Sequence, residues 1–482
     1  MKKFYSVMKF ILVMVVVIPT LVYAVPEKPP GDSNGGPGGS SSANISYTGA
    51  TTFSSETTES NKTYSSTTDS QNALLVSGGT STINSCTITK SGDASGDNAD
   101  FYGTNAAILT YNGATLNIKG GNITTDGAHA NAIFAYGTGI INISNATINT
   151  TSNNSGGVMV TGGGTLTANS CTVKTKGNSS AAIRSDRGGG TLTVNGGTYE
   201  TNGTGSPAIY STADITVNDA ELISTSSEGL VVEGANSIAI NNTKVTDTNN
   251  TLNGQSETYK NVFLYQSMSG DADEGNASFT AKNSTLLTNK GDTIFVTNTK
   301  ATISLENNTI TNNDGDFLRI QTGKWGTSGS NGGTVTLNMT NQKVNGSIIV
   351  DSISTLTMSM KNKSVLVGSI DNSNQAKNVT LSLSSDSILS LTEDTYLDSL
   401  ENETSNNSNI YSNGKYKLYV NGKEVSINSG TYDSSKITTT EKVKNTTTSK
   451  ESNNNIYYII GGVVAALFVC GGFVFFIKRK KR

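Results

Sequence analysis

The side chains of this sequence best suited to chemistry are carboxylates that lie close together in two segments. Asp271, Asp273 and Glu274 occupy one of these segments, and Asp314 and Asp316 occupy the other. Carboxylate oxygens are the ligands that Ca²⁺ prefers, so the five residues are candidates for a calcium site if neighbouring loops bring them together. No calcium-binding loop of defined spacing is complete, and solvated acidic loops are the competing interpretation.

A second set of candidates could bind an organic ligand. Asp186 and Arg187 are adjacent, just before a glycine triplet, and they could clamp a polar substrate or form a salt bridge across a turn. Trp325 is the only tryptophan and lies among Gly, Ser and Thr, a setting in which an indole can stack on a sugar ring or pack on a neighbouring loop. Together with Tyr265, these residues are the predicted ligand-binding residues.

Catalytic signatures are poor. The only histidine, His129, lies between two alanines after a glycine, and no partner for a catalytic triad is identifiable near it. We interpret His129 as a loop residue and expect no catalytic residues.

The elements that must position these side chains come from a repeat. The pattern apolar-x-apolar-x-x-small-x-apolar recurs seven times, and the small residues from Gly121 to Thr243 are spaced by 25, 25, 26, 23 and 23 residues. This spacing is too short for a propeller blade and suits one turn of a β-helix. A single turn cannot bury its own apolar face, whereas stacked turns share a continuous core. The sequence therefore predicts an all-β, parallel β-helix solenoid.

Departures from the repeat indicate loops and an end. Long loops are expected over 248–260, 267–275 and 321–333, and in solenoids such insertions often mark the binding face. The segment Lys417–Val425, with Asn421-Gly422 at its centre, predicts a hairpin that caps the open end. Cys86 and Cys171 occupy the small-residue slot three turns apart, roughly 14 Å, too far for a disulfide, so both are expected to be buried and unpaired.

The ends of the chain carry targeting signals. Residues 1–24 read as a signal peptide, and the uncharged run 456–477, followed by the basic tail 478–482, reads as a single transmembrane helix. Residues 25–43 form a Pro/Gly/Ser-rich leader, 44–433 the β-helix ectodomain with its terminal caps, and 434–455 a stalk. The expected location is the cell membrane with the ectodomain outside, and cell-wall association is the alternative.

Charge narrows the choice of partner. Without the three lysines of the signal peptide and the five basic residues of the tail, the segment 25–455 carries 26 basic and 37 acidic residues, a net charge of −11. Such a surface does not favour nucleic acid or anionic polysaccharide, and leaves cations or neutral glycans as easier partners.

Several stretches, among them 184–199, 205–212, 265–272, 325–333 and the cap-like 391–400, resemble a family of secreted right-handed β-helix proteins of Gram-positive bacteria. The resemblance covers most of the ectodomain, and it implies a right-handed, pectate-lyase-like β-helix with an adhesin-like role at the cell surface.

These observations predict a monomeric surface-displayed β-helix that binds extracellular glycans or neighbouring cells as an adhesin-like or scaffold module. The alternatives are a polysaccharide lyase or hydrolase, since that fold also hosts such enzymes, and a Ca²⁺-dependent carbohydrate-binding rod. Three or more carboxylates converging with Arg or Lys in one groove would favour the enzyme.

Overall fold

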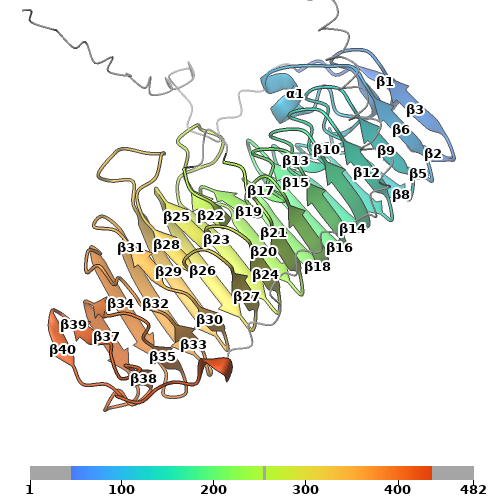
Figure 1. Cartoon of the computed structure of the whole chain (residues 1–482). Coiled ribbons are helices and arrows are strands. Elements are labelled where there is room, and N and C mark those ends of the chain that lie inside the picture. Colours follow the sequence, from blue (N-terminus) through green and yellow to red (C-terminus); the bar gives the residue numbers. More distant parts are fainter. Residues whose placement is uncertain (1–44, 253–256, 437–482) are drawn as a thin grey trace, which may run out of the picture.

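The computed structural model describes residues 45–252 and 257–436, and these residues form a parallel β-helix with 40 strands (Figure 1). Each turn of the coil contributes short strands that pair in parallel with the equivalent strands of the turns before and after it. The predicted all-β parallel solenoid is confirmed. The predicted signal peptide, transmembrane helix and basic tail lie outside the described residues.

Sheet A runs along one side of the rod and contains one strand from each of twelve successive turns. Its strands, in spatial order, are β1 (Gly49–Phe53), β4 (Asn72–Val76), β7 (Ile108–Thr110), β10 (Ile133–Tyr136), β13 (Val158–Thr161), β15 (Ile183–Ser185), β17 (Ile209–Ser211), β19 (Leu230–Glu233), β22 (Lys260–Tyr265), β25 (Asp292–Thr297), β28 (Leu318–Ile320) and β31 (Ile348–Val350).

Sheet B contains two ladders that meet at a corner. The first ladder is β2 (Thr58–Ser60), β5 (Thr80–Asn84), β8 (Thr115–Lys119), β11 (Ile140–Ser144), β14 (Gly164–Thr175), β16 (Gly190–Thr201), β18 (Asp214–Ser224), β20 (Ser237–Asn241), β23 (Asn276–Lys282), β26 (Thr299–Glu306), β29 (Gly333–Thr340), β32 (Thr355–Lys361), β34 (Asn378–Leu383) and β37 (Ser399–Asn402). The second is β3 (Thr63–Ser66), β6 (Thr87–Lys90), β9 (Asn122–Thr125), β12 (Thr147–Thr150), the far halves of β14, β16 and β18, β21 (Lys244–Asp247), β24 (Thr285–Thr288) and β27 (Thr309–Asn312).

Two small sheets complete the C-terminal part. Sheet C contains β30 (Lys343–Asn345), β33 (Val365–Val367), β35 (Ile388–Ser390) and β38 (Ile410–Tyr411), and sheet D contains β36 (Thr395–Leu397), β39 (Leu418–Val420) and β40 (Lys423–Val425). The strands β39 and β40 are antiparallel, and Asn421 and Gly422 between them have positive φ. The predicted hairpin is confirmed. The helices of the described chain are α1 (Asp97–Tyr102) and a short 3₁₀ turn (Ser434–Lys436).

The corner between the two ladders of sheet B explains the repeat. Asn145, Ser170, Asp219 and Asn242 each precede the small residue of the motif, and each has a φ near +50°. Asn and Asp tolerate this left-handed conformation better than most residues. Gly197 has a φ of 100°, and a β-carbon there would lie 2.1 Å from the carbonyl oxygen of Cys171. The small-residue slot is therefore a point where successive backbones nearly touch.

The core is a single narrow column of apolar side chains that point inward from all the sheets. In sheet A, one inward row runs from Leu74 through Ile108 and Ile133 in consecutive turns. At the N-terminal end, where the sequence predicts a terminal cap, β1, β2 and β3 already pair in register with β4, β5 and β6. Residues 49–66 therefore form a turn of the coil. Cys86 and Cys171 are buried and unpaired, as predicted.

Candidate functional site

The outward side of sheet A differs from an ordinary solvent-facing sheet, because it carries aromatic and charged residues that other segments partly cover. Towards the N-terminus, Leu75, Leu109, Phe134 and Met159 form an apolar cluster separate from the main core. Helix α1 lies against it: a β-carbon on Gly103 would lie 2.8 Å from the Phe134 ring, and the Thr161 hydroxyl donates to the carbonyl oxygen of Phe101 at 2.7 Å.

Beyond this cluster the outward positions become polar and aromatic along consecutive turns. We call the following residues the sheet A strip: Arg184, Asp186, Arg187, Tyr210, Glu233, Phe263, Tyr265, Asp271, Phe295 and Trp325. The strip has an acidic end, at β15–β19, and an aromatic end, at β22–β25.

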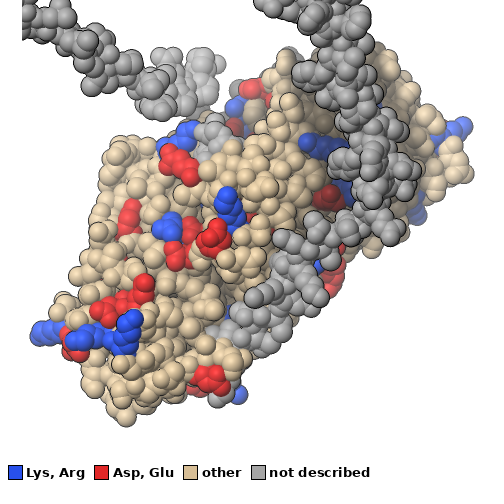
Figure 2. All heavy atoms as spheres, in the orientation of Figure 1, with Lys and Arg blue, Asp and Glu red and all other residues tan. Residues whose placement is uncertain are grey.

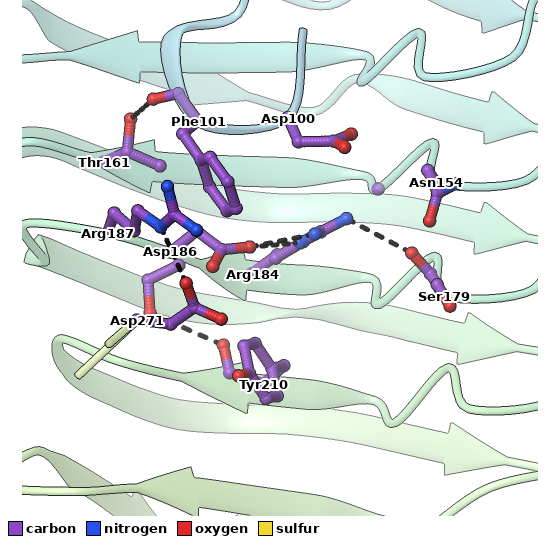
Figure 3. A network of polar contacts seen from close by, with 12 residues as sticks. Asp100, Phe101, Asn154, Thr161, Ser179, Arg184, Asp186, Arg187, Tyr210 and Asp271 are labelled. Carbon is purple, nitrogen blue, oxygen red and sulfur yellow. Dashed lines mark hydrogen bonds and ion pairs between the residues drawn. The ribbon is translucent and has the colours of Figure 1, made fainter. Parts of the chain in front are cut away.

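Arg187 holds the acidic end together by linking two long loops across the sheet. Its Nη1 lies 2.9 Å from Asp97 Oδ2 of α1, and its Nε lies 2.7 Å from Asp271 Oδ1 of the loop after β22. The guanidinium lies over the Phe101 ring, 3.9 Å from the ring centroid (Figure 3). Ser269 also donates to Asp271, at 2.9 Å. We call this arrangement of Arg187 with Asp97 and Asp271 the clasp.

Beneath the clasp lies a buried ion pair. Arg184 donates to Asp186 Oδ2 through Nη2 at 2.8 Å and through Nε at 3.1 Å (Figure 3). Burial raises the pKa of Asp186 to about 6, because removal of water disfavours the carboxylate more than Arg184 stabilises it. The negative charges of Asp271 and Glu233 raise the Asp186 pKa further.

Glu233 connects the acidic end to the aromatic end. It is 1% exposed and accepts hydrogen bonds from three hydroxyl groups, those of Tyr210, Ser267 and, at 2.9 Å, Tyr265. Burial raises the pKa of Tyr210 and of Tyr265 well above the ordinary range, and the Glu233 charge adds to this. Both tyrosines therefore remain hydrogen-bond donors at neutral pH.

The aromatic end is a cluster of rings beside a small hollow. The rings of Phe263 and Tyr265 stack with centroids 4.5 Å apart, and Trp325 tilts towards Tyr265 with centroids 6.2 Å apart. Lys260 Nζ lies 4.7 Å from the Phe263 ring centroid and 5.1 Å from that of Phe295. The hollow, of about 30 Å³, is lined by Lys260, Phe263, Phe295 and Trp325 among others. Planar rings beside polar groups are the usual components of a sugar-binding surface.

All four predicted ligand-binding residues lie along the strip. Asp186 and Arg187 are in its acidic end, and Tyr265 and Trp325 contact each other in its aromatic end. Asp186 and Arg187 do not form the salt bridge with each other that the sequence suggested as one interpretation. Asp186 binds Arg184, and Arg187 binds Asp97 and Asp271.

The five residues predicted as calcium ligands are not gathered into one site. Asp271 belongs to the clasp, and Asp316 pairs with Arg319 at 2.5 Å. Asp273, Glu274 and Asp314 are exposed. Within residues 45–252 and 257–436, no group of three or more His, Cys, Asp or Glu side chains could hold a metal ion.

His129 occupies a turn, with a φ of 54°. Its Nδ1 lies 2.7 Å from Asp100 Oδ1 and its Nε2 lies 3.1 Å from Asn154 Nδ2, so both ring nitrogens have polar neighbours. This is consistent with the predicted loop role.

Sequence reasoning missed Glu233, Arg184, Tyr210 and the two phenylalanines of the strip. A signal was present for Glu233: counting residues from the paired strands places Asp186, Thr212 and Glu233 in one outward column, in three consecutive turns. Irregular turn lengths hid that column. The pairing of Arg187 with residues 90 and 84 positions away has no local sequence signal.

No helix in the described part of the chain is long and apolar enough to cross a membrane. Comparisons with models of known protein families, with curated proteins and with solved structures found no match for this chain.

Proposed function

We propose that this chain is a cell-surface β-helix that binds extracellular glycans through the sheet A strip and so acts as an adhesin-like or scaffold module. The observation that supports this is the continuity of the strip, which places stacking rings and hydrogen-bonding carboxylates along one line across neighbouring turns. Sugar rings present an apolar face and a rim of hydroxyl groups, and they are recognised by that combination.

Each end of the strip offers a different contact. Trp325, which is half-buried, offers a face on which a sugar ring can stack, and the buried ring of Tyr265 supports it from the sheet side. Asp97, whose side chain is 66% exposed, and Asp271 offer carboxylate oxygens that can accept hydrogen bonds from sugar hydroxyl groups. Display at the cell membrane rests on the predicted targeting segments, which lie outside the described residues.

The test is retention of the purified full-length protein on a panel of mucin, plant and microbial polysaccharides, with Ca²⁺ and with a chelator. We expect selective retention that the chelator leaves unchanged. We expect Trp325→Ala to lower the affinity roughly 5- to 150-fold, because a stacked aromatic ring contributes of the order of 1–3 kcal/mol. Thr357→Ala, an exposed position on sheet B, is the matched control. The proposal would be contradicted if Trp325→Ala were retained as strongly as the wild-type protein, or if the wild-type protein were retained on no polymer.

A second function has one specific observation in its favour. Carboxylates converge with two arginines on the strip, and Asp186 and Glu233 are two turns apart in one column, about 9–10 Å at the Cα atoms. Inverting glycoside hydrolases use two carboxyl groups roughly 6.5–9.5 Å apart, one of them with a raised pKa, and a spacing of two turns is compatible with such a pair. Both carboxyl groups are buried, so hydrolysis would require the clasp to open.

Release of reducing ends from a retained polysaccharide would support hydrolysis, provided that Asp186→Asn and Glu233→Gln each abolish it while retention persists. If the wild-type protein and both variants retain the polysaccharide but release no reducing ends, the protein binds the polymer without hydrolysing it.

A further inference from the structure

One interior column of the coil contains a residue that does not match its neighbours. Lys90, at the end of β6, is paired in register with Ser66 before it and Thr125 after it. The column continues with Thr150 and Thr175. In those turns the side chain is a short hydroxyl, and those of Thr150 and Thr175 each donate to a loop carbonyl oxygen at 2.5 Å. Lys90 instead places an amine inside the rod, with 0% of the residue exposed.

The surroundings of this amine suit its neutral form. Lys90 Nζ donates to the carbonyl oxygens of Thr68 at 2.9 Å and Gly92 at 2.7 Å. A neutral amine has two N–H groups, and these two acceptors satisfy both, whereas an ammonium group has three. Burial lowers the pKa of Lys90 to about 8, against the opposing effect of Asp69, Asp93 and Asp126. The nitrogen lone pair is thus available in a large fraction of molecules at mildly alkaline pH.

The side chain next to the amine is also unusual for its column. Asn105 lies three residues before the first paired residue of β7, and the equivalent positions of later turns are Ala130, Ser155 and Ser180. Asn105 is 0% exposed, and its Nδ2 donates to Gly92 O at 2.9 Å and to Ala128 O at 3.1 Å. Its Oδ1 is buried and has no hydrogen-bond partner among the described residues.

The two exceptions therefore occur in the same turn, and they meet at one atom, since Lys90 and Asn105 both donate to the carbonyl oxygen of Gly92. A buried nucleophile and a buried carboxamide are held together by the surrounding stack. We propose that Lys90 and Asn105 are the site of an intramolecular amide cross-link.

The reaction balances without a further reactant. The Lys90 Nζ lone pair attacks Asn105 Cγ and forms the new C–N bond. The Cγ–Nδ2 bond breaks. Nδ2, which already carries two hydrogens, takes up the one proton that Nζ loses and leaves as ammonia, while Nζ keeps its other hydrogen as the N–H of the new secondary amide. Fixed proximity supplies much of the needed acceleration. Asp93 accepts from the N–H of Ala128, whose carbonyl oxygen accepts from Asn105, and the negative charge of Asp93 acts on Lys90.

The cross-link would join the ends of the segment 90–105, which carries α1. That segment supplies Asp97 and Phe101 to the clasp. The covalent bond would therefore hold the 90–105 loop against the β-helix, where non-covalent contacts otherwise hold it.

Mass spectrometry of the purified full-length protein tests the proposal. Trypsin cleaves after an unmodified lysine, so the uncross-linked chain gives separate peptides 63–90 and 91–119. We expect instead one peptide, 63–119, lighter than its sequence by one ammonia, with the link located at Lys90 and Asn105 by fragmentation. Separate peptides of full mass from the wild-type protein would overturn the proposal.

Two variants copy residues from neighbouring turns and so preserve the fold. Lys90→Thr and Asn105→Ser are each expected to abolish the loss of ammonia, whereas Asn131→Ser, at another buried asparagine with an unpartnered atom, is expected to retain it. If the ammonia loss persists in Lys90→Thr, it arises from asparagine cyclisation elsewhere and the cross-link does not exist.

Discussion

At the scale of single residues, the clasp shows how one side chain can assemble a surface from distant segments. Arg187 contacts Asp97, Asp271 and the Phe101 ring at once, and the planar guanidinium permits this because it donates in several directions while one face stays on the ring. A lysine has the charge but lacks this geometry.

Asp186 makes the stability of the protein depend on pH in an unusual direction for an acid. Its pKa is about 6 in the folded chain and near 3.9 when unfolded, so the folded state binds the proton more tightly. The resulting stabilisation is complete below about pH 4 and is lost as the pH rises through about 6. We expect Asp186→Asn to remove this dependence, which is worth roughly 1.4 kcal/mol per unit of pKa shift.

Thermal denaturation of both proteins from pH 4 to pH 7 measures this effect. The wild-type protein should lose stability relative to Asp186→Asn across that range. A constant difference between the two would show that Asp186 does not titrate there. Asp314→Asn, in an exposed loop, is the control and should follow the wild-type curve.

At the scale of the elements, the corner of sheet B sets how closely turns can stack. Gly197 has a left-handed φ and no room for a β-carbon, whereas Gly113 has a φ of 73° and nothing within 4 Å of the same position. Both substitutions to alanine cost the roughly 1–2 kcal/mol of left-handed backbone. Gly197→Ala should cost about 1–3 kcal/mol more, because the turns must move apart. Denaturant midpoints of the two variants measure the difference, and equal midpoints would contradict close stacking at this corner.

An asparagine ladder on the outer surface ties four turns together. Asn169, Asn195, Asn218 and Asn241 are joined in sequence by side-chain hydrogen bonds of 2.9 Å. Asn195→Ala removes two of these bonds and Asn241→Ala removes one, so the losses of stability should be roughly 1–3 and 0.5–1.5 kcal/mol. Chemical denaturation of the two variants compares them. An Asn241→Ala variant that is the less stable of the two would show that the ladder does not act as a chain of equivalent bonds.

The fold was predictable because a period-two apolar pattern within a repeat of constant length has one good solution, a stacked coil. The hairpin at Asn421-Gly422 was also predictable, because its signal lies in two adjacent residues. The site was only partly predictable. Trp325 and Tyr265 stood out by residue type, but Glu233 became visible only when the turns were aligned, and the clasp depends on loops whose paths no local pattern specifies.

At the scale of the whole molecule, the rod is modular because each turn contacts mainly its neighbours. On the face shown in Figure 2, basic and acidic side chains are interspersed over a mostly uncharged surface, so no charged patch joins distant turns there. The clasp is the exception, since it spans the turns between α1 and β22.

Modularity predicts which deletions the fold tolerates. Leu337 and Met358 are register partners, so removal of 338–358 deletes one turn and leaves the rows aligned. This variant should remain folded, with a slightly lower melting temperature and a rod shorter by about 4.8 Å. Removal of 338–348 should prevent folding of that region, because inward and outward side chains no longer match. Circular dichroism and small-angle scattering distinguish the two, and equal outcomes would contradict independent turns.

The hairpin of β39 and β40 has a consequence for how these molecules meet one another. A parallel stack grows by adding identical rungs, and an unprotected last rung would accept a strand from a second molecule as readily as from its own chain. The final strand of sheet D runs in the opposite direction and presents Lys423 and Glu424 outward, so the template ends there. A further parallel rung cannot be added in register to that strand, so the hairpin disfavours end-to-end growth of one molecule onto another at sheet D.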